Sequence, residues 1–369
     1  MFFLNKKILC ISDHSNMLGG GEYSFLDLLH YLPAPLKPIA VVPSNGELSL
    51  LLREVGVETH IIQLSTIRLW TLHKMLKTMK QIVNLCRKIQ PALIYSNGSR
   101  AAFYAGASKP FHKLPVIWHC RIADRDPYLD LLLVYLTNLI VTNSLATAKR
   151  FKSNFQQKIK VIHNGVDIKW MTDMAVEKPK LIQDDWKVIL KVARVSRRKK
   201  HNVILDAFEQ VAGLIPDAHL FCIGAKDVAE SEWWDFLQKR TQQSVYSERI
   251  HWVGQVEDVR PWYRAADILV LGSLGEAFGR VLVEAMACGV TVIATRSGGV
   301  PEIVRHGQDG LLVPPGNIDE MAEAMTKMLQ DESLRKRASH SAQERAGLFS
   351  LDNHVDRMVQ IFEETISLH

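Results

Sequence analysis

The chain has 369 residues and a mass of 41.8 kDa, which is too long for one small domain and suits two domains of ordinary size. A hydrophobic share of 47% and a charged share of 23% exclude a disordered, collagen-like or disulfide-stapled chain. The net charge of +6 is uneven, because residues 1–170 hold 21 Lys and Arg against 10 Asp and Glu, whereas residues 171–369 hold 24 against 29.

Composition also narrows the location of the chain and its redox chemistry. Five widely separated cysteines predict buried free thiols rather than disulfides or a Cys-x-x-Cys metal site. No apolar run approaches the roughly 18 residues of a membrane-spanning helix. The N-terminal residues lack the pattern of a cleavable leader. We therefore expect an intracellular, cytoplasmic protein.

The first half of the chain alternates short β-branched runs with longer amphipathic stretches. This is the pattern of parallel strands joined by crossover helices. The expected strands cover residues 8–12, 39–42, 59–62, 93–95, 116–119, 139–142 and 160–163. Such a series predicts a doubly wound α/β sheet.

A second series follows a polar, aperiodic stretch from 167 to about 186, which predicts an interdomain linker. The expected strands of this series cover residues 188–193, 219–223, 250–253, 268–271, 291–294 and 310–313. Helices are expected at residues 203–211, 281–287, 318–329 and, as a terminal amphipathic helix, 353–365.

The sequence thus predicts an α/β protein of two Rossmann-like domains. The first covers residues 1–167, and the second covers residues 168–349. The terminal helix, at about 350–369, is expected to pack back on the first domain. Because ligands of such folds bind at the carboxyl ends of the strands, we expect the site in a cleft between the domains.

Three glycines at 19–21 follow the first expected strand and lead into a helical stretch at 23–31. Glycine lets a backbone approach a ligand closely, and the amides at a helix start favour an anion. The spacing fits neither the dinucleotide-binding fingerprint nor a P-loop. A phosphate site and a plain tight turn both remain open as interpretations.

A cationic segment from Arg194 to Lys200 follows the first strand of the second domain. Such cations at the end of a parallel strand suit phosphate oxygens, because Arg offers a two-pronged fork and Lys a point charge. A solvated loop is the alternative. Nucleic acid is not indicated, since no helix-turn-helix, zinc-finger or RNP signature accompanies the cluster.

The most informative segment runs from Ser273 to Gly289. It follows the strand at 268–271, passes a glycine-containing turn and enters a helix that Gly289 ends. Glu276 lies before this helix and Glu284 near its beginning. Carboxylates in these places can accept hydrogen bonds from sugar or ribose hydroxyls, while amides at the helix start can hold a diphosphate. For Glu284, a surface position on an amphipathic helix is the alternative.

This segment resembles the signature of retaining glycosyltransferases of family 4, which have the GT-B fold. Seven residues separate Glu276, in Glu-Ala-Phe-Gly, from Glu284, in Glu-Ala-Met-Ala. Other pieces agree in order and spacing, namely Gly20-Gly21-Glu22, His163 to Asp167, Arg194 with Lys199, Ala266-Asp267 and Ser297 to Glu302. The resemblance spans nearly the whole chain and is most specific between residues 250 and 316.

The resemblance implies a donor substrate, a nucleoside-diphosphate sugar, and a role for each matching residue. Arg194 and Lys199 would neutralise the diphosphate, Glu284 would bind the ribose and Glu276 would contact the transferred sugar. The implied donor-binding positions are Gly20, Gly21, Arg194, Lys199, Glu276, Phe278, Gly279, Arg280, Val281 and Glu284. The implied catalytic positions are Arg194, Lys199, Glu276 and His119, which matches the family's active-site histidine by its place at the end of a strand.

The resemblance also implies a hexosyltransferase that keeps the anomeric configuration and needs no metal ion or other cofactor. Its acceptor would be a saccharide or a lipid-linked saccharide in cell-envelope polysaccharide synthesis. Glu276 and Glu284 would then bind ligand rather than act as a glycosidase acid/base pair. The Asp124-Arg-Asp126 triplet matches a metal motif of another glycosyltransferase fold, but such short matches arise readily by chance. The alternatives are a nucleotide-sugar epimerase or hydrolase and a non-catalytic binder of nucleotide sugars or polyanions.

Residues 67–80 predict a helix that lies on a membrane surface. At helical spacing they combine an apolar face with flanking cations. The apolar residues are Leu69, Trp70, Leu72, Met75, Leu76 and Met79, and the cations are Arg68, Lys74, Lys77 and Lys80. An ordinary core-facing helix is the alternative. The positive first half of the chain favours peripheral contact with an anionic membrane.

Overall fold

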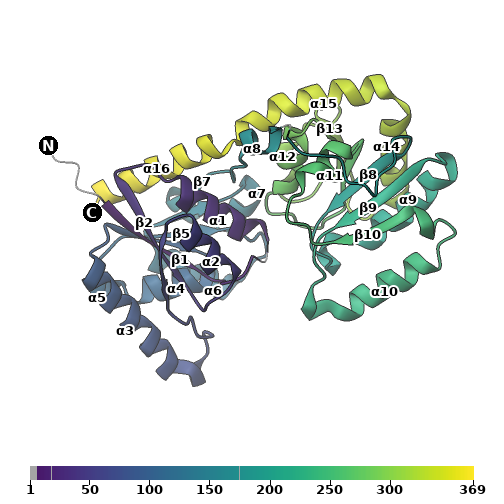
Figure 1. The fold of residues 1–369 in the computed structure, drawn as a ribbon. Helices are drawn as coiled ribbons and strands as arrows, with labels where there is room; N and C mark the ends of the chain where they lie inside the picture. The colour runs from purple at the N-terminus through teal and green to yellow at the C-terminus, as the bar shows by residue number, and fades with distance from the viewer. Residues whose placement is uncertain (1–5, 18, 174) are drawn as a thin grey trace. The chain divides into compact units, whose positions relative to one another are not determined.

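The computed structural model describes residues 6–17, 19–173 and 175–369. The described chain divides into two compact units, shown in Figure 1. Unit 1 comprises Met1–Gly165 together with Leu351–His369, and unit 2 comprises Val166–Ser350. The division falls between residues 165 and 166, where the sequence placed it between 167 and 168.

Unit 1 is built on a parallel sheet with the strand order β3-β2-β1-β4-β5-β6-β7. The strands are β1 (Lys6–Ser12), β2 (Leu36–Val42), β3 (Glu58–Ile61), β4 (Leu93–Asn97), β5 (Val116–Cys120), β6 (Leu139–Thr142) and β7 (Ile159–Val161). The helices are α1 (Gly20–Tyr31), α2 (Glu47–Glu54), α3 (Leu72–Ile89), α4 (Ser99–Ala107), α5 (Lys109–His112), α6 (Pro127–Leu136), α7 (Leu145–Ala148) and α16 (Leu351–Ser367). Short 3-10 turns are η1 (Leu69–Thr71) and η2 (Ser153–Lys158).

Helices cover both faces of this sheet, which explains why its strands read as continuous apolar runs. Leu9 and Ile11 of β1 pack with α3, α4 and α6, whereas Ile8 and Cys10 pack with α1, α2 and α16. The terminal helix α16 therefore belongs to the core of unit 1, and Figure 1 shows it running beside this unit. The sequence predicted α1 to begin at residue 23, but the helix starts three residues earlier and includes Gly20 and Gly21.

Unit 2 is built on a second parallel sheet, with the strand order β10-β9-β8-β11-β12-β13. The strands are β8 (Lys187–Val192), β9 (Ala218–Ile223), β10 (Ile250–Gly254), β11 (Ile268–Leu271), β12 (Thr291–Thr295) and β13 (Gly310–Val313). The helices are α8 (Ile168–Thr172), α9 (His201–Leu214), α10 (Ser231–Gln242), α11 (Arg260–Ala265), α12 (Arg280–Ala287), α13 (Val300–Ile303), α14 (Ile318–Gln330) and α15 (Glu332–Ala346). Short 3-10 turns are η3 (Arg197–Lys199), η4 (Val228–Glu230), η5 (Ser247–Arg249) and η6 (Gly347–Phe349).

The core of unit 2 lies on both faces of its sheet. Leu190 of β8 packs with α11, α12 and α13 on one face, and Ile189 packs with α9, α10 and α14 on the other. The doubly wound α/β architecture that the sequence predicts is confirmed in both units. Each expected strand is present, with ends within three residues of the expected ones.

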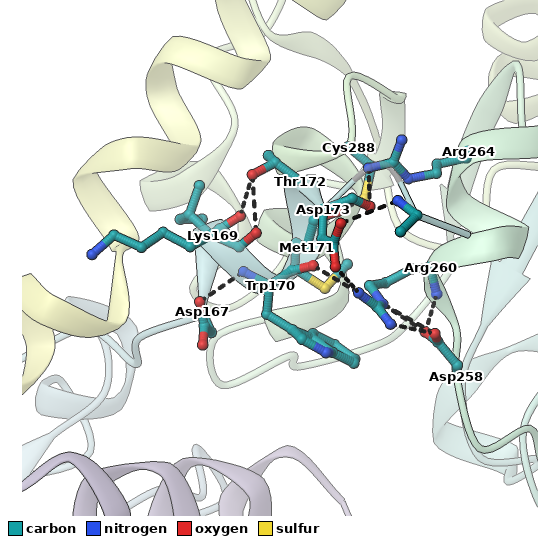
Figure 2. Close-up of polar contacts among 12 residues, drawn as sticks. Asp167, Lys169, Trp170, Met171, Thr172, Asp173, Asp258, Arg260, Arg264 and Cys288 are labelled. Carbon is teal, nitrogen blue, oxygen red and sulfur yellow. Dashed lines mark hydrogen bonds and ion pairs between the residues drawn. The ribbon is translucent and has the colours of Figure 1, made fainter.

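The segment that the sequence predicted as an interdomain linker begins with a short helix, α8, which is held to the rest of unit 2 (Figure 2). Asp167 caps α8 by accepting a hydrogen bond from the Trp170 amide at 2.9 Å. The Arg260 guanidinium lies 4.3 Å from the Trp170 ring centroid and donates to the Trp170 carbonyl at 3.2 Å. Arg264 donates to the Asp173 carbonyl at 2.5 Å. These contacts hold α8 to α11, because cations satisfy carbonyls at the end of a helix that is too short to be stable alone.

Candidate functional site

The carboxyl ends of β8 and β11 form the centre of the site in unit 2. These strands are neighbours in the sheet although β9 and β10 separate them in sequence, so the strand order reverses between them. Ligands of open α/β sheets bind at such a reversal. The loop after β8 carries Lys199 and the loop after β11 carries Glu276, and their side chains form an ion pair with 2.6 Å between Nζ and Oε2.

The charge state of Glu276 follows from this pairing. Burial by itself would raise the pKa of the carboxyl. The charge and the hydrogen bond of Lys199, together with a hydrogen bond from Ser273 and the charge of Arg198, outweigh burial, so the pKa of Glu276 is held below its ordinary value. Glu276 is therefore ionised at neutral pH and accepts hydrogen bonds without donating a proton. The Lys199 ammonium has three N–H groups, so it can also donate to a second anion while it is paired with Glu276.

A close backbone approach fixes the loop that carries Glu276. The Gly299 amide donates to the Glu276 carbonyl at 2.8 Å, and the Gly275 amide donates to the Ser297 hydroxyl at 2.8 Å. Gly298 has a φ of +59°, and a Cβ placed there would lie 1.9 Å from the Glu276 carbonyl oxygen. Only glycine fits this position, because it tolerates both the left-handed backbone and the contact. The Ser297 to Glu302 motif thus supports the Glu276 loop.

Glu284 lies near the middle of α12, the helix that begins after Gly279. One carboxylate oxygen accepts from Arg280 Nε at 2.8 Å, and the other accepts from the Tyr263 hydroxyl at 2.9 Å. Burial and the neighbouring carboxylate raise the pKa of Tyr263 well above its ordinary value, so the hydroxyl stays a donor. The side chain of Glu284 is only 14% exposed, which excludes the alternative of a solvated surface residue.

The other predicted donor-binding positions near α12 differ in what they can offer. The side chain of Phe278 is buried, and its ring packs edge-on against Phe349 with 5.8 Å between the ring centroids, so this side chain belongs to the core. Val281 is partly buried against the same core. Gly279 adopts a left-handed φ of 98° at the N-cap of α12, where helix amides begin. A helix start of this kind favours an anion.

Arg194 forms an ion pair of its own. Its side chain is 45% exposed and its Nε lies 3.4 Å from a carboxylate oxygen of Asp227, which follows β9. Asp227 also caps η4 by accepting from the Ala229 amide. Sequence analysis missed Asp227, because nothing in the sequence pairs a residue after β9 with the loop after β8. Their proximity depends on the adjacency of the two strands.

Unit 1 has a comparable arrangement at its own strand reversal, between β1 and β4. Asp13 follows β1 and is buried against the start of α4, where its carboxylate accepts from the amides of Arg100 at 3.1 Å and Ala101 at 2.6 Å. Gly98 has a φ of +122°, and a Cβ there would lie 2.3 Å from Asp13 Oδ2. The carboxylate therefore caps α4 from another strand and draws the two loops together.

The predicted glycines of unit 1 lie next to an arginine that sequence analysis did not assign. Gly20 and Gly21 are the first residues of α1, and a Cβ at Gly21 would meet the side chain of Arg121 at 3.5 Å. Arg121 follows β5 and donates through Nε to Asn97 Oδ1 at 2.7 Å and also to Asn164 Oδ1. A cation directly after an expected strand was a usable signal, as it was for Arg194.

His119 lies within β5 and its side chain has no exposed surface. Its Nδ1 is 2.7 Å from the hydroxyl of Tyr95, and its ring lies 6.4 Å from that of His354 in α16. Burial, and next the positive charge of Arg121, hold the pKa of His119 well below its ordinary value, so the ring is neutral. The predicted place at the end of a strand is confirmed, but the side chain is fully enclosed there. A catalytic role for His119 stays a prediction, and it requires the ring to become accessible.

The predicted membrane helix is divided between core and surface. Met75 and Met79 pack against the core of unit 1, as the core-facing alternative expects. Trp70, Leu72 and Leu76 remain exposed, at 73%, 53% and 56%. The side chain of Leu69 lies outside the described residues. Within the described ranges, no helix is long and apolar enough to cross a membrane.

The Asp124-Arg-Asp126 triplet has no metal-binding arrangement around it. Asp126 caps α6 by accepting from the Leu129 amide at 3.1 Å. Across the part of the chain that the structure describes, no three side chains of His, Cys, Asp or Glu are grouped to hold a metal ion. Helix capping thus accounts for Asp126.

Two family models match the chain in succession. The model described as Glycosyltransferase Family 4 matches residues 18–170. The model described as Glycosyl transferases group 1 matches residues 174–345. Together they cover most of both units.

Curated relatives match at low identity. The lipopolysaccharide core biosynthesis glycosyltransferase LpsE of Rhizobium meliloti is 29% identical over 61% of this chain and 64% of its own length. A D-inositol 3-phosphate glycosyltransferase of Corynebacterium jeikeium is 32% identical over 56% of this chain and 52% of its own length. The uncharacterized glycosyltransferase MJ1607 of Methanocaldococcus jannaschii is 26% identical over 80% and 73%. The chain thus spans between about half and three quarters of the length of these relatives.

Solved structures match over nearly the whole chain. Anabaena Alr3699/HepE in complex with UDP-glucose has a TM-score of 0.85 at 23% identity, over 97% of this chain and 99% of that one. A glycosyltransferase from Rickettsia africae has a TM-score of 0.87 at 19% identity, over 98% and 99%. These likenesses show the fold, which agrees with the predicted architecture of two Rossmann-like domains.

Proposed function

The chain belongs to glycosyltransferase family 4, and on that premise we propose that it transfers a sugar from a nucleoside-diphosphate sugar to a saccharide or lipid-linked saccharide. The observation that carries the proposal is the Lys199–Glu276 ion pair at the strand reversal of unit 2. It offers an ammonium for a diphosphate and an ionised carboxylate for sugar hydroxyls at one point.

The chemistry of the transfer follows from where charge develops. Cleavage of the bond between sugar and phosphate leaves negative charge on the departing diphosphate, and fixed cations and helix-start amides stabilise such charge. Lys199, Arg194 and the amides at the start of α12 would supply this stabilisation. The acceptor hydroxyl would attack on the face that the phosphate leaves, and the phosphate oxygen would take its proton. The anomeric configuration is then retained without a protein nucleophile.

Two further features fit donor binding. Each oxygen of Glu284 already accepts one hydrogen bond, from Arg280 and from Tyr263, and a carboxylate oxygen has two lone pairs. The remaining lone pairs suit the vicinal hydroxyls of a ribose. The lowered pKa of Glu276 supports a binding role, because an ionised carboxylate cannot act as the general acid of a glycosidase. The roles of Gly20 and Gly21 at the diphosphate remain predictions from the family resemblance.

We further propose that the acceptor is met at the inner face of a membrane and that it serves cell-envelope polysaccharide synthesis. The relative LpsE carries lipopolysaccharide core biosynthesis in its name, which supports this direction. The exposed Trp70, Leu72 and Leu76 lie among Arg68, Lys74 and Lys77, a combination that favours an anionic lipid surface. The Arg68 guanidinium lies 5.1 Å from the Trp70 ring centroid. We also propose that transfer needs no metal ion.

A thermal-shift panel tests the donor site. UDP, GDP, ADP and CDP are added with and without EDTA to the wild type and to Glu284→Gln, which keeps the shape of the side chain but loses its charge. A ligand at a hundred times its dissociation constant stabilises the folded protein by about 2.7 kcal/mol. We expect a shift for one nucleotide that EDTA leaves unchanged and that Glu284→Gln reduces. UDP is the first choice because Alr3699/HepE binds it.

The outcome of the panel directs the next assay. With the selected nucleotide sugar, transfer to an acceptor and the anomeric configuration of the product are followed by NMR. Loss of donor without any acceptor would instead indicate the hydrolase or epimerase, and binding without turnover would indicate the silent binder. No shift with any nucleotide would refute the proposed donor site.

A further inference from the structure

A lysine lies buried near the carboxyl end of β8, in contact with the loop that carries Lys199. Lys191 has no exposed surface, although it is flanked in the strand by residues of an apolar core. Lysine is almost never fully buried without a partner, because removing an ammonium from water costs several kcal/mol. Packing in the sheet would be served as well by an apolar residue of similar size. The burial of this ammonium therefore has to be offset by a specific interaction.

The partner of the ammonium is part of the cationic loop itself. Lys191 Nζ donates to the backbone carbonyl of Lys199 at 2.9 Å. This carbonyl lies at the end of η3, next to Lys200, whose φ of 49° places it in the left-handed region. A residue with a Cβ is held there only when its surroundings fix it. The same turn projects the side chain of Lys199 to Glu276.

Other bonds fix the neighbouring residues of the loop. The Arg198 carbonyl accepts from the Leu274 amide at 3.0 Å, and the Arg197 amide donates to a Glu230 carboxylate oxygen at 2.6 Å. The loop is thus held from the β11 side and from η4. Lys191 holds the loop at a third point, the backbone carbonyl of Lys199, whose side chain makes the ion pair with Glu276.

We propose that Lys191 is a positioning residue that holds the Lys199 turn in the conformation that binds the donor diphosphate, and that its buried charge adds to the attraction for that anion. The inference rests on the proposed function. A buried charge is poorly screened by water, so it acts on a nearby anion more strongly than an exposed one.

The charged and titratable groups around Lys191 come from each neighbouring element. Cys222 lies opposite it in β9, His201 begins α9, Lys199 ends η3 and Glu276 follows β11. Burial holds the thiol of Cys222 protonated, with its pKa raised to about 12, and holds the pKa of His201 well below its ordinary value. The strand β11 itself contributes only apolar side chains. Glu276 is thus the counter-charge, and Lys199 is a second cation.

These surroundings make the charge of Lys191 sensitive to pH in an accessible range. Burial lowers the pKa of Lys191 to about 8; the nearby Lys199 ammonium also lowers it, and Cys222 and Glu276 oppose the shift. The ammonium is therefore present at neutral pH and is lost as the pH rises through about 8. An anion bound above it favours the protonated form, so protonation and donor binding are coupled.

The test compares the wild type with Lys191→Met and with a matched control, Lys187→Met. The control removes the same charge from the same strand at its opposite end, where the side chain is partly exposed. Dissociation constants for UDP are measured by calorimetry at several values between about pH 7 and about pH 9.5, a range that brackets the lowered pKa of Lys191 and stays below the ordinary pKa of an exposed lysine. Thermal unfolding at each pH verifies that every variant is folded.

We expect UDP to bind Lys191→Met about tenfold or more weakly at pH 7, because a hydrogen bond from a charged group and a buried charge are both lost. The ratio of its dissociation constant to that of the wild type should fall toward one at the high end of the range. Titration of UDP and of shared groups cancels in this ratio. Lys187→Met should match the wild type throughout. A ratio of one at pH 7, or a ratio that does not change with pH, overturns the proposal.

Hydrogen exchange of the ligand-free protein gives a readout that does not depend on UDP. Lys191→Met should accelerate exchange at the amides of residues 196–201, whereas Lys187→Met should not, and equal exchange in both variants overturns the positioning role. Failure of the proposed function has a different signature. The wild type would then bind no nucleotide, while the exchange difference at the loop would persist.

Discussion

Replacement of Gly298 by alanine tests the backbone approach that supports the Glu276 loop. The new Cβ would lie 1.9 Å from the Glu276 carbonyl oxygen, 2.8 Å from its carbon and 3.0 Å from the Glu276 amide nitrogen. All three atoms are backbone, so no side-chain rotation relieves the contact. The carbonyl must move by about 1.5 Å to reach an ordinary van der Waals separation.

The expected cost has two parts. The left-handed backbone at a φ of +59° costs an alanine about 1–2 kcal/mol. The shift of the carbonyl weakens the 2.8 Å hydrogen bond from the Gly299 amide, which is worth about 0.5–1.5 kcal/mol. We therefore expect Gly298→Ala to lower the free energy of unfolding by about 3 kcal/mol.

Gly307→Ala is the matched control. Gly307 also has a positive φ, of +77°, but a Cβ there would have no heavy atom within 4 Å. Gly307→Ala therefore has the cost of the left-handed backbone without a steric contact of the new Cβ. The change in the entropy of the unfolded chain is the same in both variants. We expect about 1–2 kcal/mol for the control.

Urea unfolding followed by tryptophan fluorescence measures both free energies, and sugar transfer measures the site. Because Glu276 would be displaced from Lys199, we expect the rate of transfer to fall about 100-fold in Gly298→Ala at a temperature where it is folded. The control should keep the wild-type rate. Equal destabilisation of the two variants, or full activity of Gly298→Ala, would refute the reasoning from the close approach.

Three further outcomes are expected. Glu276→Gln should lower stability at neutral pH by about 1–2 kcal/mol, because Lys199 loses its counter-charge. Since the pKa of Glu276 is lowered in the folded state, this difference should begin to shrink as the pH falls below the ordinary value of 4.5. It should be lost only when the pH has passed the lower pKa of the folded state, and an unchanged difference in strong acid would contradict the assigned ion pair. Arg260→Met should release α8 and speed proteolysis near Trp170, with a cost of about 1–3 kcal/mol in urea unfolding, and unaltered cleavage would show that α8 is held without it. Leu76→Ser should weaken sedimentation with anionic vesicles by about tenfold without loss of stability, because the side chain is 56% exposed, and equal binding would refute membrane contact there.

For the two glutamates of the signature, Glu276 and Glu284, the sequence gives the spacing and the structure gives the hydrogen-bond partners. Their spacing and their place around a helix start are visible in the sequence. The structure adds that Glu276 is held ionised by Lys199, and that Glu284 is oriented by Tyr263 and Arg280. Tyr263 carries no signal in the sequence, because its hydroxyl meets Glu284 only after α11 packs against α12.

For His119, the sequence correctly locates the residue at the end of a strand, but it does not predict that packing buries the side chain. The sequence locates it at the end of an expected strand. In the folded unit, α16 returns from the far end of the chain and covers that strand, so that His354 and Tyr95 surround the ring. Burial depends on segments more than two hundred residues away in sequence, and strand periodicity does not contain that information.

The amino-acid sequence alone predicts the α/β class, the order of the strands along the chain and the loops that carry the signature residues. These depend on local periodicity and turn chemistry, which neighbouring residues encode. Three contacts become visible only in the folded chain. The loops after β8 and β11 meet, Asp227 pairs with Arg194, and the ammonium of Lys191 donates to the Lys199 carbonyl. The physical reason is that strand order within a sheet, and the burial and charge interactions that follow from it, arise between segments far apart in the chain.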